Sequence, residues 1–313
     1  MRYGEEDRQS TNVEDRRGEG GGTFSRGRGI PIPIGGGGLS ITSILVIGAI
    51  CLMLGINPLE LLSGSEGMPR MPDMPRSSPR SGSPFEIPGG QQPRPAPQSD
   101  ETSQFVRRVL ADTEDVWDRV FQAAGKRYEK PTLVLFTRAT QTACGTGQSA
   151  MGPFYCPPDR KVYIDLDFFK ELRDRFQAPG DLAQAYVIAH EVGHHVQTLL
   201  GVANKVQSLK QQAMQRGDER EVNRLQVRME LQADCLAGVW MSKIKKRLQD
   251  GEIEGALNAA AQIGDDTLQK RTQGRAVPDS FTHGSAQQRT RWLKRGYESA
   301  RTQLCDTFGT SEL

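Results

Sequence analysis

Residues 181–200 read DLAQAYVIAHEVGHHVQTLL, and this stretch decides how the rest of the chain is arranged. Pro179-Gly180 precedes it and stops any earlier helix, while Asp181 is placed to cap a new one. Gly201 follows as a helix terminator. Because apolar residues fill most of the positions between these signals, the stretch predicts one long helix packed into the core.

The stretch contains His190-Glu191-Val192-Gly193-His194, an H-E-x-x-H motif. Residues four apart lie on one face of a helix, so His190 and His194 can present two imidazoles to one cation. Glu191 lies beside them and can reach a water molecule on that cation. The motif therefore predicts a zinc site with a glutamate base, and the competing interpretation is a buried helix with two hydrogen-bonded histidines.

A catalytic zinc ion usually has three protein ligands and one open position, so a third ligand is needed downstream. Glu230-Leu231-Gln232-Ala233-Asp234 places two acids on one face of a predicted helix. In this hypothesis Glu230 binds the metal and Asp234 accepts the free ring N–H of His190. Spacing alone leaves open an ordinary acidic helix face, but the apolar neighbours favour buried acids that need partners.

The other periodic segments predict an α+β fold class, with a mostly helical domain and a small antiparallel sheet. Helical spacing is found in residues 105–121, 167–176, 204–249 with a break near Gly217, 252–263 and 285–300. Short apolar or alternating runs at 133–136 and 161–166 predict strands.

Residues 39–56 read LSITSILVIGAICLMLGI and carry no charge. As a helix they would reach about 27 Å, close to the hydrocarbon thickness of a bilayer. A signal peptide fits less well, because 38 polar residues precede the run and no A-x-A-like cleavage site follows it. A buried core helix also fits less well, because Pro/Gly-rich segments flank the run. We predict one transmembrane helix.

This span divides the chain into predicted parts. Residues 1–38 mix both charge signs with many glycines and predict a disordered tail. Residues 57–100 form a Pro/Gly/Ser-rich linker, and residues 101–308 form the zinc-binding domain. Four arginines lie between residues 16 and 28, whereas no Lys or Arg follows the span until Arg70. The positive-inside rule then places the N-terminus in the cytoplasm and residues after 57 outside.

Four of the five cysteines fall in the predicted domain, and the fifth, Cys51, lies in the apolar run. Cys144 and Cys156 flank a Gly/Pro-rich loop and are the first candidate disulfide, which leaves Cys235 with Cys305. Spacing does not fix connectivity, and free buried thiols are the alternative. Disulfides are expected outside the cytoplasm, which agrees with the predicted orientation.

Nucleic acid is excluded as an expected partner. The formal net charge is only +2, and the chain has neither C-x-x-C pairs nor a basic stripe interleaved with aromatic residues.

The strings H-E-V-G-H-H and E-L-Q-A-D-C-L-A-G resemble those of the bacterial neutral zinc metallopeptidase family. The ends of the chain extend the resemblance over nearly its whole length, with M-R-Y-G-x-x-x-x-S-x-N-V-E-D-R-R-G at the start and D-S-F-T-H-G-S-A-Q-Q-R near the end. The resemblance implies a short cytoplasmic tail, a single span in the bacterial inner membrane and a gluzincin-like periplasmic domain. It also implies that Glu230 is the third ligand.

Ser280-Phe281-Thr282-His283-Gly284-Ser285, followed by Arg289, is similar to the T-H-P-S…R element of membrane-associated gluzincins, with Gly284 in place of proline. By that resemblance His283 would assist transition-state binding and Arg289 would brace the site, while a surface-loop histidine is the alternative. His195 is rotated by about 100° from His194, so it cannot share the chelate.

The predicted function is a membrane-anchored peptidase that hydrolyses peptide bonds of a protein or peptide substrate. Zn²⁺ would activate the water and Glu191 would be the general base. Two alternatives remain: a membrane scaffold that binds zinc without catalysis, and a zinc hydrolase acting on a cell-envelope substrate. The sequence predicts no cleavage preference and no oligomeric state.

Overall fold

The helices begin and end where the local sequence provides caps. The computed structural model describes residues 1–19 and 100–313. Asp100 accepts the backbone N–H of Ser103 at the start of α3, and Ser285 with Gln288 forms a capping box at the start of α10. Gly180 and Gly201, both at positive φ, bound α5. The helices are α3 (Glu101–Ala123), α4 (Asp167–Asp174), α5 (Asp181–Leu199), α6 (Val202–Gln215), α7 (Glu219–Lys243), α8 (Glu252–Gln262), α9 (Asp265–Gln273) and α10 (Ala286–Ser299).

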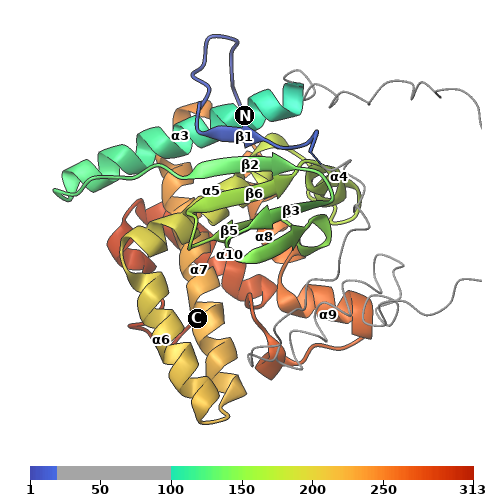
Figure 1. Ribbon diagram of the computed structural model, residues 1–313, viewed down its shortest axis with the longest axis vertical. Helices are drawn as coiled ribbons and strands as arrows, with labels where there is room; N and C mark the ends of the chain where they lie inside the picture. The colour runs from blue at the N-terminus through green and yellow to red at the C-terminus, as the bar shows by residue number, and fades with distance from the viewer. Residues whose placement is uncertain (20–99) are drawn as a thin grey trace, which may run out of the picture. The chain divides into compact units, whose positions relative to one another are not determined.

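A four-stranded sheet in the order β1-β2-β6-β5 lies beside these helices (Figure 1). Its strands are β1 (Val13–Asp15), β2 (Thr132–Phe136), β5 (Phe154–Cys156) and β6 (Lys161–Asp165). β1, β2 and β6 are parallel, and only β5 runs antiparallel to its neighbour β6. A separate antiparallel hairpin joins β3 (Ala139–Thr142) to β4 (Gly145–Gln148).

The mostly helical α+β class is confirmed, but the prediction of an antiparallel sheet is wrong. β2 and β6 are buried on both faces, as strands of parallel sheets usually are. Leu133 and Ile164 belong to the main core, whereas Val134 and Tyr163 belong to a second cluster on the other side. Alternation in the sequence reports which face a side chain occupies and carries no information on strand direction.

The prediction of a disordered tail over residues 1–38 is wrong for residues 1–19. β1 pairs with β2 in the register Val13↔Leu133, and the side chain of Met1 lies in the main core. The composition argument failed because it averaged these residues with the Gly-rich residues 20–38, which lie outside the described residues. The domain therefore includes residues 1–19 in addition to the predicted 101–308.

The predicted membrane span lies outside the part of the chain that the structure describes. The span is residues 39–56, and almost all of the linker, residues 57–99, lies outside the described residues as well. Within residues 1–19 and 100–313, no helix is both long and apolar enough to cross a bilayer. The predicted span and the predicted orientation of the N-terminus and the domain therefore stay predictions.

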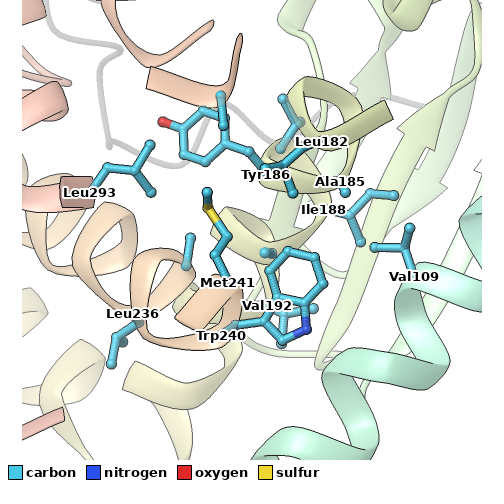
Figure 2. Close-up of a cluster of buried hydrophobic side chains, with 14 of the residues drawn as sticks. Val109, Leu182, Ala185, Tyr186, Ile188, Val192, Leu236, Trp240, Met241 and Leu293 are labelled. Carbon is cyan, nitrogen blue, oxygen red and sulfur yellow. The ribbon is translucent and has the colours of Figure 1, made fainter. Parts of the chain in front are cut away.

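The core lies where α5 crosses α7, α10 and α3 (Figure 2). Leu182, Ile188 and Val192 of α5 meet Trp240 and Met241 of α7 in this cluster, and all five are buried. Val109 of α3 and Leu293 of α10 close its sides. The motif helix is thus packed on several sides, as its apolar sequence predicts, which holds its polar face in a fixed position.

Three helical glycines allow these helices to pack at very short range. A Cβ on Gly193 of α5 would lie 3.0 Å from the carbonyl oxygen of Ala233 in α7. A Cβ on Gly238 of α7 or Gly296 of α10 would lie 2.1 Å or 1.9 Å from a backbone oxygen of the facing helix. The backbones of α5, α7 and α10 therefore touch, and α7 is fixed between the other two.

Disulfides add two links between distant parts of this framework. The structure joins Cys144 to Cys156 and Cys235 to Cys305, the two pairs considered from the sequence. The first ties the β3–β4 hairpin to β5, and the second ties α7 to the C-terminal segment after α10.

We predict that Gly296→Ala destabilises the protein by about 1–3 kcal/mol or more, because the added methyl overlaps backbone atoms that cannot move independently. Gly255→Ala is the matched control, since a Cβ there meets only the oxygen of Pro179 at 3.8 Å. The control should be neutral or stabilising by up to about 1 kcal/mol. Thermal unfolding measures both, and equal melting temperatures would contradict the close α7–α10 contact.

Candidate metal centre

Three side chains from two helices converge beside the core. His190 and His194 come from α5, and Glu230 comes from α7. Their ligand atoms lie within 4.8 Å of one another. Nε2 of His190 is 3.2 Å from Oε2 of Glu230, and Nε2 of His194 is 3.4 Å from the same oxygen. The structure thus brings the three predicted ligands to one point.

Hydrogen bonds at the other ring nitrogen fix the orientation of each imidazole. Nδ1 of His190 is 2.8 Å from Oδ1 of Asp234, and Nδ1 of His194 is 2.8 Å from Oε1 of Gln197. Both oxygens accept, so each Nδ1 carries a proton, and Nε2 of each ring is the nitrogen that faces Glu230 and that a metal would use. Gln197 itself is held because its amide donates to the carbonyl of Met229.

Glu230 is oriented in the same way, by Gln226 of α7, which is itself held by Lys210 of α6. The Gln226 amide donates to Oε1 of Glu230 at 2.6 Å, and Nζ of Lys210 donates to Oε1 of Gln226 at 2.7 Å. Because Oε1 is occupied by Gln226, Oε2 is the oxygen presented to the two histidines. The arrangement favours a carboxylate that binds a metal through one oxygen.

Asp234 is the centre of a buried polar network that joins three helices. The carboxylate accepts hydrogen bonds from His190, from the hydroxyl of Tyr186 at 2.6 Å, and from both Nε and Nη2 of Arg289 at 2.9 Å. Asp234 is fully buried and Arg289 of α10 is 3% exposed. This forked ion pair satisfies two charges that neither helix could bury alone.

The charges in this network shift the pKa values of its members. Burial by itself would raise the pKa of Asp234, but Arg289 and His190 outweigh it and lower the pKa to about 2. Burial likewise opposes ionisation of Glu230, yet the charge of His194 and the hydrogen bonds from both histidines hold its pKa well below the usual range. Both acids are therefore carboxylates at neutral pH.

Glu191 differs from the other acids of the site. It is 7% exposed, and its carboxylate has no hydrogen-bond or ion-pair partner within residues 1–19 and 100–313. It lies close enough to His194 for its charge to raise the pKa of that histidine. A buried carboxylate without a donor is costly unless function requires it, so Glu191 is a candidate proton acceptor.

His283 lies at the mouth of the site on the loop before α10. Its side chain is 48% exposed, and its Nδ1 is 3.3 Å from Oδ1 of Asp265. The other oxygen of Asp265 accepts the backbone N–H groups of Thr282, His283 and Gly284, which fixes the loop. Desolvation opposes the charged form of His283, but the bond to Asp265 and the charge of Glu230 outweigh it and raise its pKa.

His195 belongs to a different environment, on the side of α5 that faces the sheet. Its Nε2 is 2.6 Å from the carbonyl oxygen of Glu129, so the ring donates there and its Nδ1 accepts from the hydroxyl of Tyr155 at 3.0 Å. His195 is fully buried and takes no part in the ligand cluster, as its rotation away from His194 predicts.

Sequence reasoning missed several residues that hold this site. They are Tyr186, Gln197, Lys210, Gln226 and Asp265. Helical spacing could have nominated three of them, because Tyr186, Gln197 and Gln226 each lie one helical turn from a predicted ligand. Asp265 and Lys210 carried no signal, because their partners lie far away in the sequence.

The donor set suits Zn²⁺. Two imidazole nitrogens and one carboxylate oxygen are the protein ligands of many catalytic zinc sites, and a fourth position is left for water or substrate. The preformed orientation of all three donors by Asp234, Gln197 and Gln226 is the support that such sites require. A metal ion held here would lie beside the carboxylate of Glu191.

A family model described as "Putative neutral zinc metallopeptidase" matches residues 1–308. The chain belongs to this family. Two relatives show how far the similarity extends. The "Uncharacterized protein YpfJ" of Escherichia coli (strain K12) is 48% identical over 306 residues, which cover 97% of this chain and 98% of that protein. The "Uncharacterized protein Mb2605" of Mycobacterium bovis is 41% identical over 226 residues, which cover 68% of this chain and 74% of that protein. No solved structure matches the chain.

The match confirms the resemblance identified from the motifs and its extent along the chain. It also includes residues 1–19, which agrees with their place in the metallopeptidase domain.

We predict that Gln226→Ala weakens zinc binding by about 10–100-fold, because Glu230 loses the donor that fixes its orientation. Gln211→Ala, at an exposed position of α6, is the matched control and should bind zinc as the wild type does. Competition titration against a chromophoric zinc chelator measures both affinities. An unchanged affinity in Gln226→Ala would mean that this amide does not orient Glu230.

Proposed function

We propose that the protein is a zinc-dependent peptidase with a gluzincin-like site. One observation carries the proposal: a preformed His190–His194–Glu230 donor set lies next to Glu191, a buried carboxylate with no hydrogen-bond partner in the described residues. Metal binding alone requires the three donors but gives no reason to bury a free carboxylate beside them. This favours hydrolysis over the alternative of a zinc-binding scaffold.

Zn²⁺ bound by the three donors would polarise the scissile carbonyl and lower the pKa of a water molecule that it holds. Glu191 accepts the proton of the attacking water and returns it to the leaving amine. The absence of a competing donor to Glu191 in the described residues leaves its oxygens available for this transfer. Asp234 and Gln197 keep the histidines in the tautomer that ligates metal.

His283 is the proposed donor to the carbonyl oxygen as that oxygen gains charge. Its Nδ1 faces Asp265, so its Nε2 is left for substrate. The raised pKa extends the pH range in which this imidazole carries both protons and can donate. Arg289 does not face substrate in this proposal, because both sides of its guanidinium group are used on Asp234 and Tyr186.

We place the extended substrate along β5. Among the described strands β5 pairs only with β6, and Tyr155 of β5 is hydrogen-bonded to His195 of the motif helix. A substrate strand added at the other edge of β5 would be held by backbone hydrogen bonds, independently of its side chains. A protein or peptide substrate is also what the family description implies.

The proposed location is the bacterial inner membrane, with the domain outside the cytoplasm. The two disulfides support the second part, because such bonds persist in oxidising compartments. The uncharged residues 39–56 support an attachment to the membrane. A substrate in the cell envelope would be consistent with this location.

We predict that Glu191→Gln abolishes peptide hydrolysis while about one zinc ion per chain remains bound. The amide keeps the size of the side chain but accepts no proton, so the rate should fall by about 10²–10⁴-fold. His194→Ala is the contrasting variant and should lose zinc as well. Cleavage of a degenerate peptide library and elemental analysis measure the two properties, and continued cleavage by Glu191→Gln would overturn the proposal.

We predict that Asp265→Asn shifts the alkaline limb of the kcat/KM profile to lower pH. Asp265 raises the pKa of His283, so without its charge His283 loses its proton at a lower pH and stops donating earlier. Asp279→Asn is the control, because Asp279 is an exposed acid four residues before His283 in the sequence. This variant should leave the profile unchanged. An unshifted profile in Asp265→Asn would exclude His283 as the titrating group.

A further inference from the structure

Residues 1–17, here called the N-terminal strap, are bound to the domain at both ends and in the middle. At one end the nitrogen of Met1 lies 3.1 Å from the carboxylate of Asp181, the first residue of the motif helix α5. At the other end Arg17 is ion-paired with Asp100, the N-cap of α3. Between them the strap contributes β1 to the sheet. These contacts fix its position against both helices and the sheet.

The middle of the strap satisfies a charge that the domain cannot satisfy alone. Glu114 of α3 is fully buried. Its carboxylate accepts from Ser10 Oγ at 2.5 Å, Asn12 Nδ2 at 2.8 Å and Arg8 Nη1 at 2.9 Å, all from the strap. The partner from elsewhere in the described chain is Lys130, at 3.6 Å. Without the strap Glu114 would be a buried carboxylate with one distant cation.

A second cluster ties the strap to the short 3-10 helix Lys245–Arg247, which follows α7. Arg247 pairs with Asp7 of the strap and with Asp112 of α3, each at 2.9 Å. The Tyr3 hydroxyl donates to Asp112 at 2.9 Å, and the guanidinium of Arg247 lies 5.0 Å from the centre of the Tyr3 ring. The strap thus completes two charge clusters, one on α3 and one between α3 and the 3-10 helix that follows α7.

We propose that the N-terminal strap is a built-in strand of the metallopeptidase domain and lies in the same compartment as the metal site. The two ends of the chain between residues 19 and 100 therefore return to one side of any membrane that this stretch enters. A single crossing would move Arg8, Ser10 and Asn12 away from Glu114, and removing the partners of a buried charge is strongly destabilising. This inference is independent of the proposed peptidase activity.

Paired cysteine labelling tests the shared compartment in intact cells of a bacterial host. The background is full-length Cys51→Ser, in which the remaining cysteines are the disulfide-bonded pairs. Gln9→Cys places a thiol on the strap and Gln211→Cys places one on α6, both at exposed positions. A membrane-impermeant maleimide is applied before and after permeabilisation, and labelling in denaturant gives the total thiol.

Both thiols should show the same accessibility, either labelled in intact cells or labelled only after permeabilisation. Either result supports the proposal, since it concerns the shared compartment and not its identity. Labelling of one thiol in intact cells and of the other only after permeabilisation would overturn it.

A double-mutant cycle on the purified full-length protein tests the strap contact itself. Asn12→Ala should lower the melting temperature by several degrees, because a donor to the buried carboxylate is lost. In the background of Glu114→Gln, which carries no charge to satisfy, the same change should cost clearly less. Glu6→Gln, at an exposed strap position with no hydrogen-bond or ion-pair partner among the described residues, is the control and should leave the melting temperature unchanged. Equal effects of Asn12→Ala in both backgrounds would exclude the strap as the partner of Glu114.

Discussion

The fully buried carboxylate of Asp234 is the interaction on which the candidate site depends. It accepts hydrogen bonds from Tyr186 and His190 of α5 and from Arg289 of α10, while it is itself part of α7. Each of these partners is costly to bury without it, and it is costly to bury without them. The three helices can therefore come together only in the register in which this network is complete. That register also places Glu230, one turn earlier on α7, against the two histidines.

Glycines make the same register sterically accessible. Gly193 lies within the motif and contacts the backbone of Ala233, which lies between Glu230 and Asp234 in the sequence and directly precedes Asp234. Since any larger residue would push α7 away from α5, the distance between ligand atoms on the two helices depends on this contact as much as on the polar network. The neighbour of Gly193 is therefore the helix that provides the third ligand.

Local sequence signals predicted the helices and the donor residues, because both depend on spacing within one element. The 3.6-residue period located α3, α5 and α10, and the positions of His190 and His194 on one face follow from the same geometry. The direction of β2 relative to β6 and the support that Lys210 gives to Gln226 depend on contacts between separate segments, which a single sequence does not encode by spacing. The strap was missed for the same reason: Ser10 and Asn12 look like ordinary polar residues until Glu114, 104 and 102 positions away, is placed beside them.

Asp234 and Glu114 show a common principle for placing charge inside this fold. Each carboxylate is fully buried, and each is satisfied mainly by residues from other segments of the chain. Neither acid can be buried in a partly assembled structure without an unpaired charge, so formation of the site and docking of the strap are both coupled to completion of the fold. Glu230 is a third buried carboxylate, and its partners are the two histidines of α5. A hydrogen bond between an imidazole Nε2 and Oε2 of Glu230 requires a proton between them, and a divalent cation bound by these three residues would replace that proton.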